Sequence, residues 1–197
     1  MSGRQYAVID VETTGLSPVS GRVVEIGLLL VNDAWDILDS YETLVNPEGP
    51  VGATWIHGIT SDMVIDAPFF HEVLGDVISF LRGSVLVAHN IPFDRGFLLA
   101  ELARAGVHVS GLPSVCTLSL ARKLYPRVPS RSLGPLCAHL GTPLERAHTA
   151  LGDCKAAFFL LQHFSRQVDI SRHITHRHTS TLWPDMPLSG RSLSRFV

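Results

Sequence analysis

Two acidic side chains interrupt the apolar segment "VIDVETTGLSP" at residues 8–18, which otherwise has the pattern of a buried strand. Side chains alternate between the two faces of a strand, so Asp10 and Glu12 must point to the same side. Two carboxylates in a partly dry site repel each other, and they require a basic partner, a shared proton or a metal ion. The segment therefore predicts a core strand that carries a chemically demanding acidic pair.

The segments that follow predict a mixed α/β fold. Apolar runs at 22–31 and 35–47, joined by turn residues Asn32 and Asp33, add two strands and complete an antiparallel meander. Short apolar strands at 84–90 and 114–117 then alternate with segments of helical periodicity at 68–83, 93–105, 118–126, 132–141 and 149–164. Strands that begin antiparallel and then alternate with helices indicate a mixed sheet flanked by helices.

Composition fits one globular domain. The 197 residues are 46% hydrophobic and 17% charged, which argues against a disordered chain. The three cysteines lie far apart, so neither a disulfide framework nor a zinc site is expected. No apolar run approaches the ~20 residues that span a bilayer, and the first residues lack a signal-peptide pattern. We therefore expect a cytoplasmic protein that does not contact a membrane.

The periodic pattern ends near Phe164, so we expect residues 1–164 to form the domain and residues 165–197 an extended or partly disordered tail. The tail holds five arginines and two aspartates, whereas the whole chain has a formal net charge of −2. An acidic domain can still bind a polyanion when divalent cations occupy its carboxylates.

Two further acids lie where ligands collect in α/β sheets. Asp94 lies in the first turn of the helix that follows the strand at 84–90, and Asp153 lies near the start of the last helix. Each taken alone is also explained by the preference of helix N-termini for acids. Together with Asp10 and Glu12, they would form a cluster of oxygen ligands, which favours Mg²⁺ or Mn²⁺ over zinc. Two such ions form a clamp for in-line attack on a phosphodiester.

His148 precedes Asp153 by five positions, so it projects from the loop that leads into the last helix. A histidine with a pKa of ~6.5 beside a metal-bound water is suited to accept its proton near neutral pH. An exposed loop residue is the alternative interpretation, and the nearby acids favour the catalytic one.

The motifs "VIDVETTGL", "HGIT", "VAHNIPFDRGFL" and "HTALGDCKAA" occur in an order that resembles the DEDDh group of DnaQ-like 3′→5′ exonucleases. The best-known member of this group is the proofreading subunit of bacterial DNA polymerase III. The resemblance covers about residues 6–164 and implies a ribonuclease H-like fold and two divalent ions, Mg²⁺ or Mn²⁺.

The resemblance also implies residue roles. Asp10, Glu12 and Asp153 would hold the catalytic metal, Asp10 and Asp94 would place the second, and His148 would be the general base. The positions that match substrate contacts of the family are Thr13, Thr14, Gly15, Leu16, His57 and Phe93. Leu16 and Phe93 are also typical of a core, and His57 of an ordered turn. Asn90 matches a helix cap better than a ligand.

The implied activity is release of nucleoside 5′-monophosphates from DNA 3′ ends, in proofreading or repair, with a DNA polymerase subunit as a candidate partner. The same chemistry on RNA is the near alternative, because selection depends on how the 2′-hydroxyl is received. A catalytically inactive nucleic-acid-binding scaffold and a ribonuclease H-type endonuclease are the other classes. No acid of the motif set is missing, which argues against the scaffold.

Overall fold

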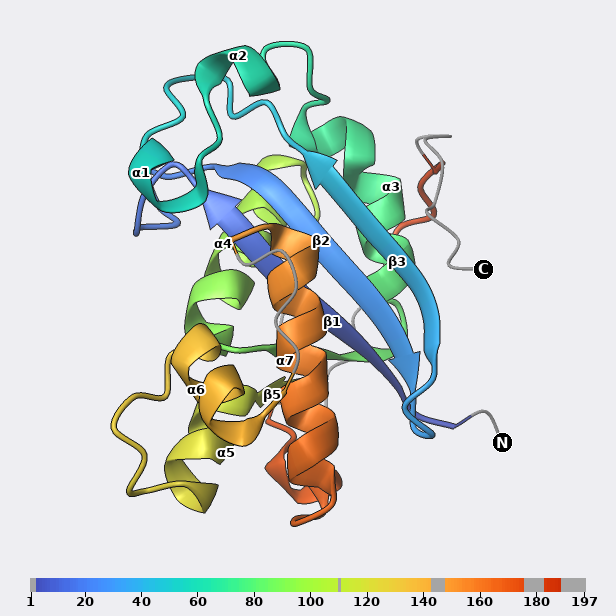
Figure 1. Cartoon of the computed structure of the whole chain (residues 1–197). Helices are drawn as coiled ribbons and strands as arrows, with labels where there is room; N and C mark the ends of the chain where they lie inside the picture. The colour runs from blue at the N-terminus through green and yellow to red at the C-terminus, as the bar shows by residue number, and fades with distance from the viewer. Residues whose placement is uncertain (1–2, 110, 143–147, 176–182, 189–197) are drawn as a thin grey trace.

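The computed structural model describes residues 3–109, 111–142, 148–175 and 183–188. Its strands are β1 (Gln5–Thr13), β2 (Val23–Asn32), β3 (Ile37–Leu44), β4 (Ser84–Ala88) and β5 (Ser114–Cys116). Its helices are α1 (Thr54–His57), α2 (Ser61–Val64), α3 (Phe70–Leu81), α4 (Ile91–Arg104), α5 (Thr117–Leu124), α6 (Leu133–Leu140), α7 (Ala150–Ser165) and the 3₁₀ helix η1 (Ile170–His173) (Figure 1).

The strands form one sheet in the order β3-β2-β1-β4-β5. β1 pairs antiparallel with β2, and β2 pairs antiparallel with β3, whereas β4 and β5 run parallel to β1. The predicted meander followed by alternating strands and helices is therefore confirmed. Because β1 is central, the acids that follow its apolar residues lie at the middle of the sheet.

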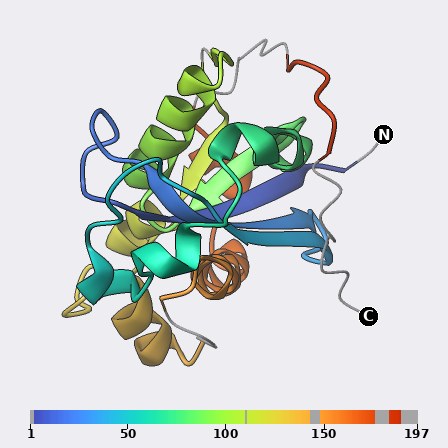
Figure 2. The same ribbon diagram turned by 90° about the horizontal axis from the view of Figure 1, so that it is seen from above.

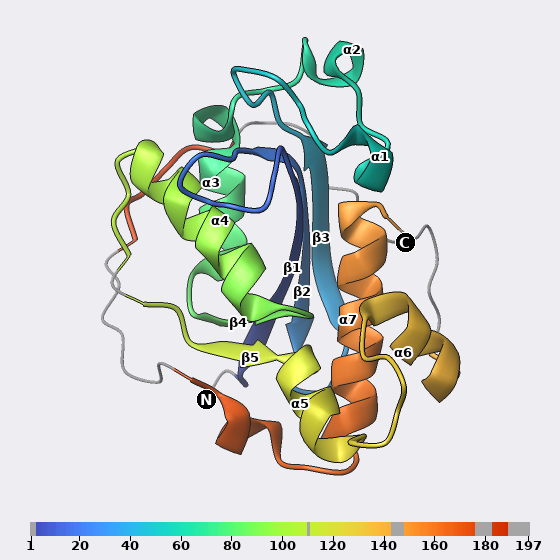
Figure 3. The same cartoon turned by 90° about the vertical axis from the view of Figure 1, so that its left-hand side faces the viewer.

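Helices cover both faces of the sheet. Helices α3 and α4 lie on one face, and α5, α6 and α7 lie on the other (Figures 2 and 3). Alternate residues of β1 supply the two cores: Ala7, Ile9 and Val11 face α3 and α4, whereas Tyr6 and Val8 face α7. The alternation places Asp10 and Glu12 on the α7 face, as predicted from the period of two.

Helices α1 and α2 are two short helices on either side of the motif "HGIT", whose first residue, His57, ends α1. A small cluster of Val24, Val51, Ile59 and Val64 holds this region against the sheet. Both helices lie at the end of the molecule where α7 begins (Figure 1).

The predicted tail begins where α7 ends. Its described part includes η1, and Thr175 exchanges backbone hydrogen bonds with Ser114 at 2.9 and 3.1 Å. Farther along, Trp183 packs against the α3 side of the core, and Arg82 donates to Asp185 at 3.1 Å. The division of the chain after residue 164 remains a prediction, and residues 176–182 and 189–197 lie outside the described residues. None of the helices within the described residues has the length and apolar character needed to cross a bilayer.

Candidate active site

Strand β1 brings Asp10 and Glu12 to its carboxyl end. Oxygen atoms of Asp10, Glu12 and Asp153 all lie within 4.8 Å of one another, so three residues offer a shared cation site. Asp153 belongs to the first turn of α7, which packs against β1 and β2. Residues separated by more than 140 positions therefore meet, as the sequence predicted.

The start of α7 is held by acidic side chains of the sheet. The amide of Ala150 donates to Glu25 at 2.9 Å, and the amide of Leu151 donates to Glu42 at 3.1 Å. Thr149 caps the helix by accepting from the amide of Gly152 at 3.2 Å. These contacts satisfy N–H groups that a helix leaves unpaired at its start, and they fix the position from which Asp153 projects.

Gly27 permits this approach. A Cβ atom at Gly27 would lie 2.6 Å from the nitrogen of Leu151 and would also overlap Ala150. Gly27 pairs with Asp10 in the sheet register, so the one glycine of β2 lies directly opposite the acid. The close approach of α7 to the sheet beside Asp10 thus depends on Gly27.

Asp94 lies in the first turn of α4, on the face of the sheet opposite α7. Its side chain is buried, with 4% of the residue exposed, and its carboxylate accepts hydrogen bonds from its own amide and from that of Val11. Asp94 lies outside the group of three ligand atoms within 4.8 Å, but its charge raises the pKa of Asp10. We call Asp10, Glu12, Asp94 and Asp153 the carboxylate cluster.

Burial raises the pKa of every acid in the carboxylate cluster, and repulsion adds to the rise at Asp10, Glu12 and Asp94. Burial raises the pKa of Glu12 to about 7, with the charges of Glu25, Asp153 and Asp94 adding to the effect. Burial also raises the pKa of Asp94 to about 7, and it raises the pKa of Asp10 well above its usual value. Four acids that resist ionisation in close proximity are the arrangement that divalent cations relieve. Hard carboxylate oxygens are the donors preferred by Mg²⁺ and Mn²⁺, so the residues fit such ions.

His148 lies in the turn before α7 and is exposed, with φ of +64°. Its backbone amide and its ring charge both act to lower the pKa of Asp153, although burial prevails and the pKa of Asp153 is raised. The predicted loop position next to the cluster is therefore observed. Its role as a base stays a prediction.

A pocket of about 520 Å³, which we call the apolar pocket, adjoins the carboxylate cluster. It is lined by all six predicted substrate residues, Thr13, Thr14, Gly15, Leu16, His57 and Phe93, together with Val11, Glu12, Ala53, Trp55 and Ile56. Glu12 belongs both to this pocket and to the cluster. The two sets of residues that the sequence singled out are therefore adjacent.

Hydrogen bonds hold the Thr13–Leu16 turn and His57 in place. Thr13 Oγ1 donates to the carbonyl of Gly15 at 2.7 Å, and the amide of Arg22 donates to Thr14 Oγ1 at 3.0 Å. Nδ1 of His57 accepts from the amide of Ile59 at 3.0 Å, which assigns the proton of the neutral ring to Nε2. Burial lowers the pKa of His57, although the carbonyls of Thr13 and Gly52 favour its protonated form.

Sequence reasoning missed four residues that shape the site. Glu25 and Glu42 anchor α7, and Trp55 and Ile56 line the apolar pocket. Glu25 carried the same signal as Asp10, a charge inside an apolar strand. Trp55 is 83% exposed, which its sequence context does not disclose. Asn90 occupies the N-cap position of α4 as expected, but its side chain makes no capping hydrogen bond within the described residues.

A family model, RNase_T, described as an exonuclease, matches residues 7–161. The chain belongs to this exonuclease family. It is 39% identical to the PolC-type DNA polymerase III of Bacillus cereus over 158 residues, which are 79% of this chain and 11% of that protein. The PolC-type enzyme of Bacillus subtilis is 39% identical over 159 residues, which are 79% of this chain and again 11% of the relative. The chain therefore spans a small part of these relatives.

Solved structures give the same family. Exonuclease X in complex with 5′ overhanging duplex DNA is 31% identical, with a TM-score of 0.66 and coverage of 82% of this chain and 92% of that chain. The nuclease domain of 3′hExo, a DEDDh family member bound to rAMP, shares the fold at 20% identity, with a TM-score of 0.70 and coverage of 84% and 93%. The resemblance to DEDDh exonucleases and the ribonuclease H-like fold are thus confirmed.

Proposed function

We propose that this protein is a metal-dependent 3′–5′ exonuclease that releases nucleoside 5′-monophosphates from DNA 3′ ends by two-metal-ion hydrolysis. The observation that carries the proposal is that Glu12 belongs to both the carboxylate cluster and the apolar pocket. A nucleotide that fills the pocket would have its phosphate beside the acids. A cytoplasmic location would fit this role, because bacterial replication proteins act on DNA in the cytoplasm.

Asp10, Glu12 and Asp153 would hold one divalent ion, and Asp10 and Asp94 would place a second. Such ions supply charge neutralisation for the phosphodiester and lower the pKa of a bound water. The chain's own residues do the rest. His148 would accept a proton from the attacking water, and the position of its loop beside Asp153 supports this role.

The apolar pocket would receive the terminal nucleotide. The exposed side chain of Leu16 and the ring of Phe93 supply apolar surface for a base. Nε2 of His57 is buried beside the carbonyls of Thr13 and Gly52 and makes no hydrogen bond of good geometry among the described residues. A small rotation of the ring would let it donate to an oxygen of the sugar or phosphate instead.

The substrate we propose is DNA, because the 31%-identical relative was solved with duplex DNA. A role in proofreading or repair, with a polymerase subunit as partner, is supported by the PolC-type relatives. Digestion of matched DNA and RNA strands separates these substrates, and a preference for RNA would contradict the assignment.

The polarity test uses a DNA strand labelled at its 3′-terminal nucleotide, incubated with and without Mn²⁺. We expect labelled mononucleotide as the first product, and only with the ion. Labelled oligonucleotides, or cutting of a circular single strand, would indicate an endonuclease instead. If the strand shortens while it keeps the 3′ label, digestion starts at the 5′ end, and the proposed polarity is wrong.

The proposed base is tested by His148→Ala. We expect turnover to fall ~10²–10⁴-fold, because an unassisted water must lose its proton. Metal binding, measured as the Mn²⁺-induced rise in melting temperature, should change little. Turnover equal to that of the unmodified protein would remove His148 from the mechanism.

A further inference from the structure

A second cavity, of about 420 Å³, lies between the first turn of α4, the junction of β5 with α5, and residues 172–175. Four side chains of its lining are basic: Arg95, Lys123, Arg172 and His173. No aspartate or glutamate occurs among its described lining residues. We propose that this basic cavity binds a backbone phosphate of the nucleic acid whose 3′ end occupies the active site, which rests on the proposed function.

Hydrogen bonds give the basic cavity a fixed wall. Ser114 and Thr175 are joined through both backbones, and their hydroxyl oxygens lie 3.0 Å apart. Arg95 donates to Oγ of Ser114 at 3.5 Å. The strand edge, α4 and the residues after η1 are therefore linked at one place, and the cavity needs no rearrangement to form.

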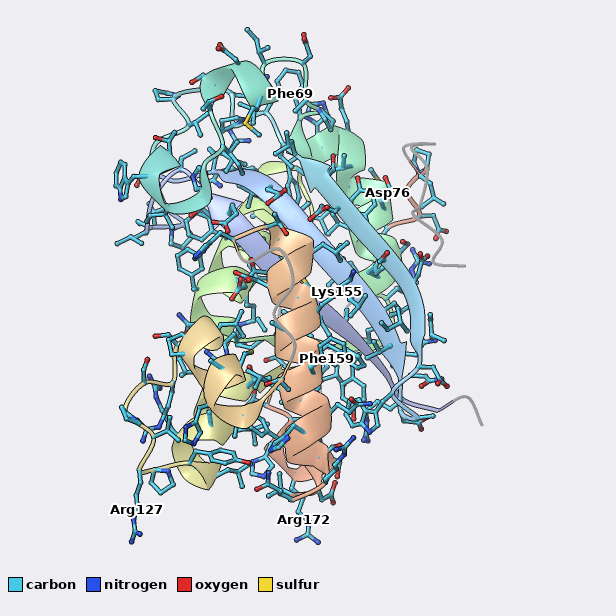
Figure 4. The ribbon with its side chains drawn as sticks, in the orientation of Figure 1. Phe69, Asp76, Arg127, Lys155, Phe159 and Arg172 are labelled. Carbon is cyan, nitrogen blue, oxygen red and sulfur yellow. The ribbon has the colours of Figure 1, made fainter. Side chains whose placement is uncertain are left out.

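Its cations are available to a ligand. Within the described chain, neither Arg95 nor Lys123 has an acidic partner within 4.0 Å. Lys123 is exposed and Arg95 is half-buried. Arg172 contributes less, because it pairs with Asp169 at 3.3 Å and its side chain extends from the body of the molecule (Figure 4). Several positive groups and hydroxyl donors without an acid recognise an anion and repel a metal cation.

The basic cavity and the active site share one turn of α4. Phe93 lines the apolar pocket, Asp94 faces the carboxylate cluster, and Pro92 and Arg95 line the basic cavity. An α-helix with its side chains is about 10–12 Å across. A nucleic-acid strand in helical form advances about 3.4 Å per nucleotide, so three or four nucleotides bridge such a distance.

Electrostatics favour a second contact of this kind. The carboxylate cluster repels a polyanion unless cations occupy it, and the whole chain carries a formal charge of −2. Positive side chains beside the cluster would hold the strand while its end enters. The phosphate can belong to the cleaved strand or to its complement, since both carry the same chemistry.

Lys123→Glu tests the basic cavity. We measure kcat/KM for a dinucleotide, too short to reach the cavity, and for an oligonucleotide of about a dozen residues. The ratio of kcat/KM for the long substrate to kcat/KM for the dinucleotide should fall about tenfold in K123E. The salt dependence of kcat/KM for the long substrate should also weaken, by about 0.7 in its logarithmic slope for one lost single-strand contact. A ratio unchanged in K123E would overturn the proposal.

Two further variants serve as controls. K123R keeps the charge and should retain the ratio. R127E makes the same charge reversal in the exposed α5–α6 loop, where Arg127 points away from the body and lies outside the cavity lining (Figure 4). A fall in R127E equal to that in K123E would overturn the proposal, because it would show a general charge effect. A duplex with a recessed 3′ end identifies the strand, since a loss larger than on single strands assigns the phosphate to the complement.

A binding experiment keeps this inference apart from the proposed function. Fluorescence anisotropy of a labelled oligonucleotide in EDTA requires no catalysis. Weaker binding by K123E than by R127E supports the basic cavity even if the protein cleaves neither substrate. Equal binding overturns it even if the exonuclease assignment holds.

Discussion

At the scale of single residues, the carboxylate cluster costs stability in the absence of cations. Glu12 and Asp94 have pKa values of about 7, and the charge of Glu25, which lies opposite Glu12 in the sheet, adds to the rise at Glu12. Replacing any one of these acids by a neutral residue should increase the stability of the metal-free protein. A cluster of charges that destabilises the fold is typical of a functional site.

Asp10→Asn should therefore have two opposite effects. It should abolish exonuclease activity, and it should raise the melting temperature of the metal-free protein by a few degrees, because one repelling charge is gone. The Mn²⁺-induced stabilisation should disappear. Asp62→Asn, which neutralises an exposed acid of α2, is the control and should alter neither property. A destabilised Asp10→Asn protein that still cleaves DNA would refute this account of the cluster.

Trp55→Ala tests the exposed rim of the apolar pocket. Stacking of a base on an aromatic ring contributes about 1–3 kcal/mol, so KM for single-stranded DNA should rise about tenfold or more. The melting temperature should stay the same, since 83% of Trp55 is exposed. Met63→Ala removes another exposed apolar side chain, on α2 and outside the lining. Equal KM changes in both variants would mean that Trp55 contacts no base.

At the scale of elements, the site depends on how closely α7 can approach the sheet. Gly27→Ala would place a methyl group against the first turn of α7 and push Asp153 away from Asp10. We expect turnover to fall at least tenfold, and the stability to drop by about 1–3 kcal/mol through overpacking. Gly49→Ala introduces the same methyl group where no atom lies within 4 Å, and it should be neutral. Full activity in Gly27→Ala would show that the approach is not required.

The sequence predicted elements well where the signal was local. The period of two placed Asp10 and Glu12 on one face, and helical spacing located α3 and α7. It failed where position depends on partners distant in the chain. The contacts of Glu25 and Glu42 with α7 link residues more than 100 positions apart. The exposure of Trp55 likewise depends on how the loop before α1 packs against the sheet, which no short motif encodes.

At the scale of the whole molecule, the raised pKa values predict how stability depends on pH. Glu12 and Asp94 have a pKa of about 7 in the folded protein but an ordinary carboxyl pKa in the unfolded chain. Between about pH 4.5 and pH 7 the folded protein therefore binds more protons than the unfolded chain. The free energy of unfolding of the metal-free protein should therefore fall as the pH rises through this window. Millimolar Mg²⁺ or Mn²⁺ should restore it at pH 7, since ions bind only the folded cluster.

Thermal melts in EDTA at several pH values, repeated with Mn²⁺, measure this dependence. Asp10→Asn should show a shallower fall, because it removes one of the interacting charges. A metal-free melting temperature that rises across the window would contradict the pKa argument.

The central claim is that four carboxylates from β1, α4 and α7 hold a pair of divalent ions. Anomalous diffraction from crystals soaked in Mn²⁺ measures this directly. We predict two peaks in contact with Asp10, one shared with Glu12 and Asp153 and one with Asp94. If the protein is active but its crystals show no anomalous peak at these oxygens, or show manganese only elsewhere, the account is contradicted.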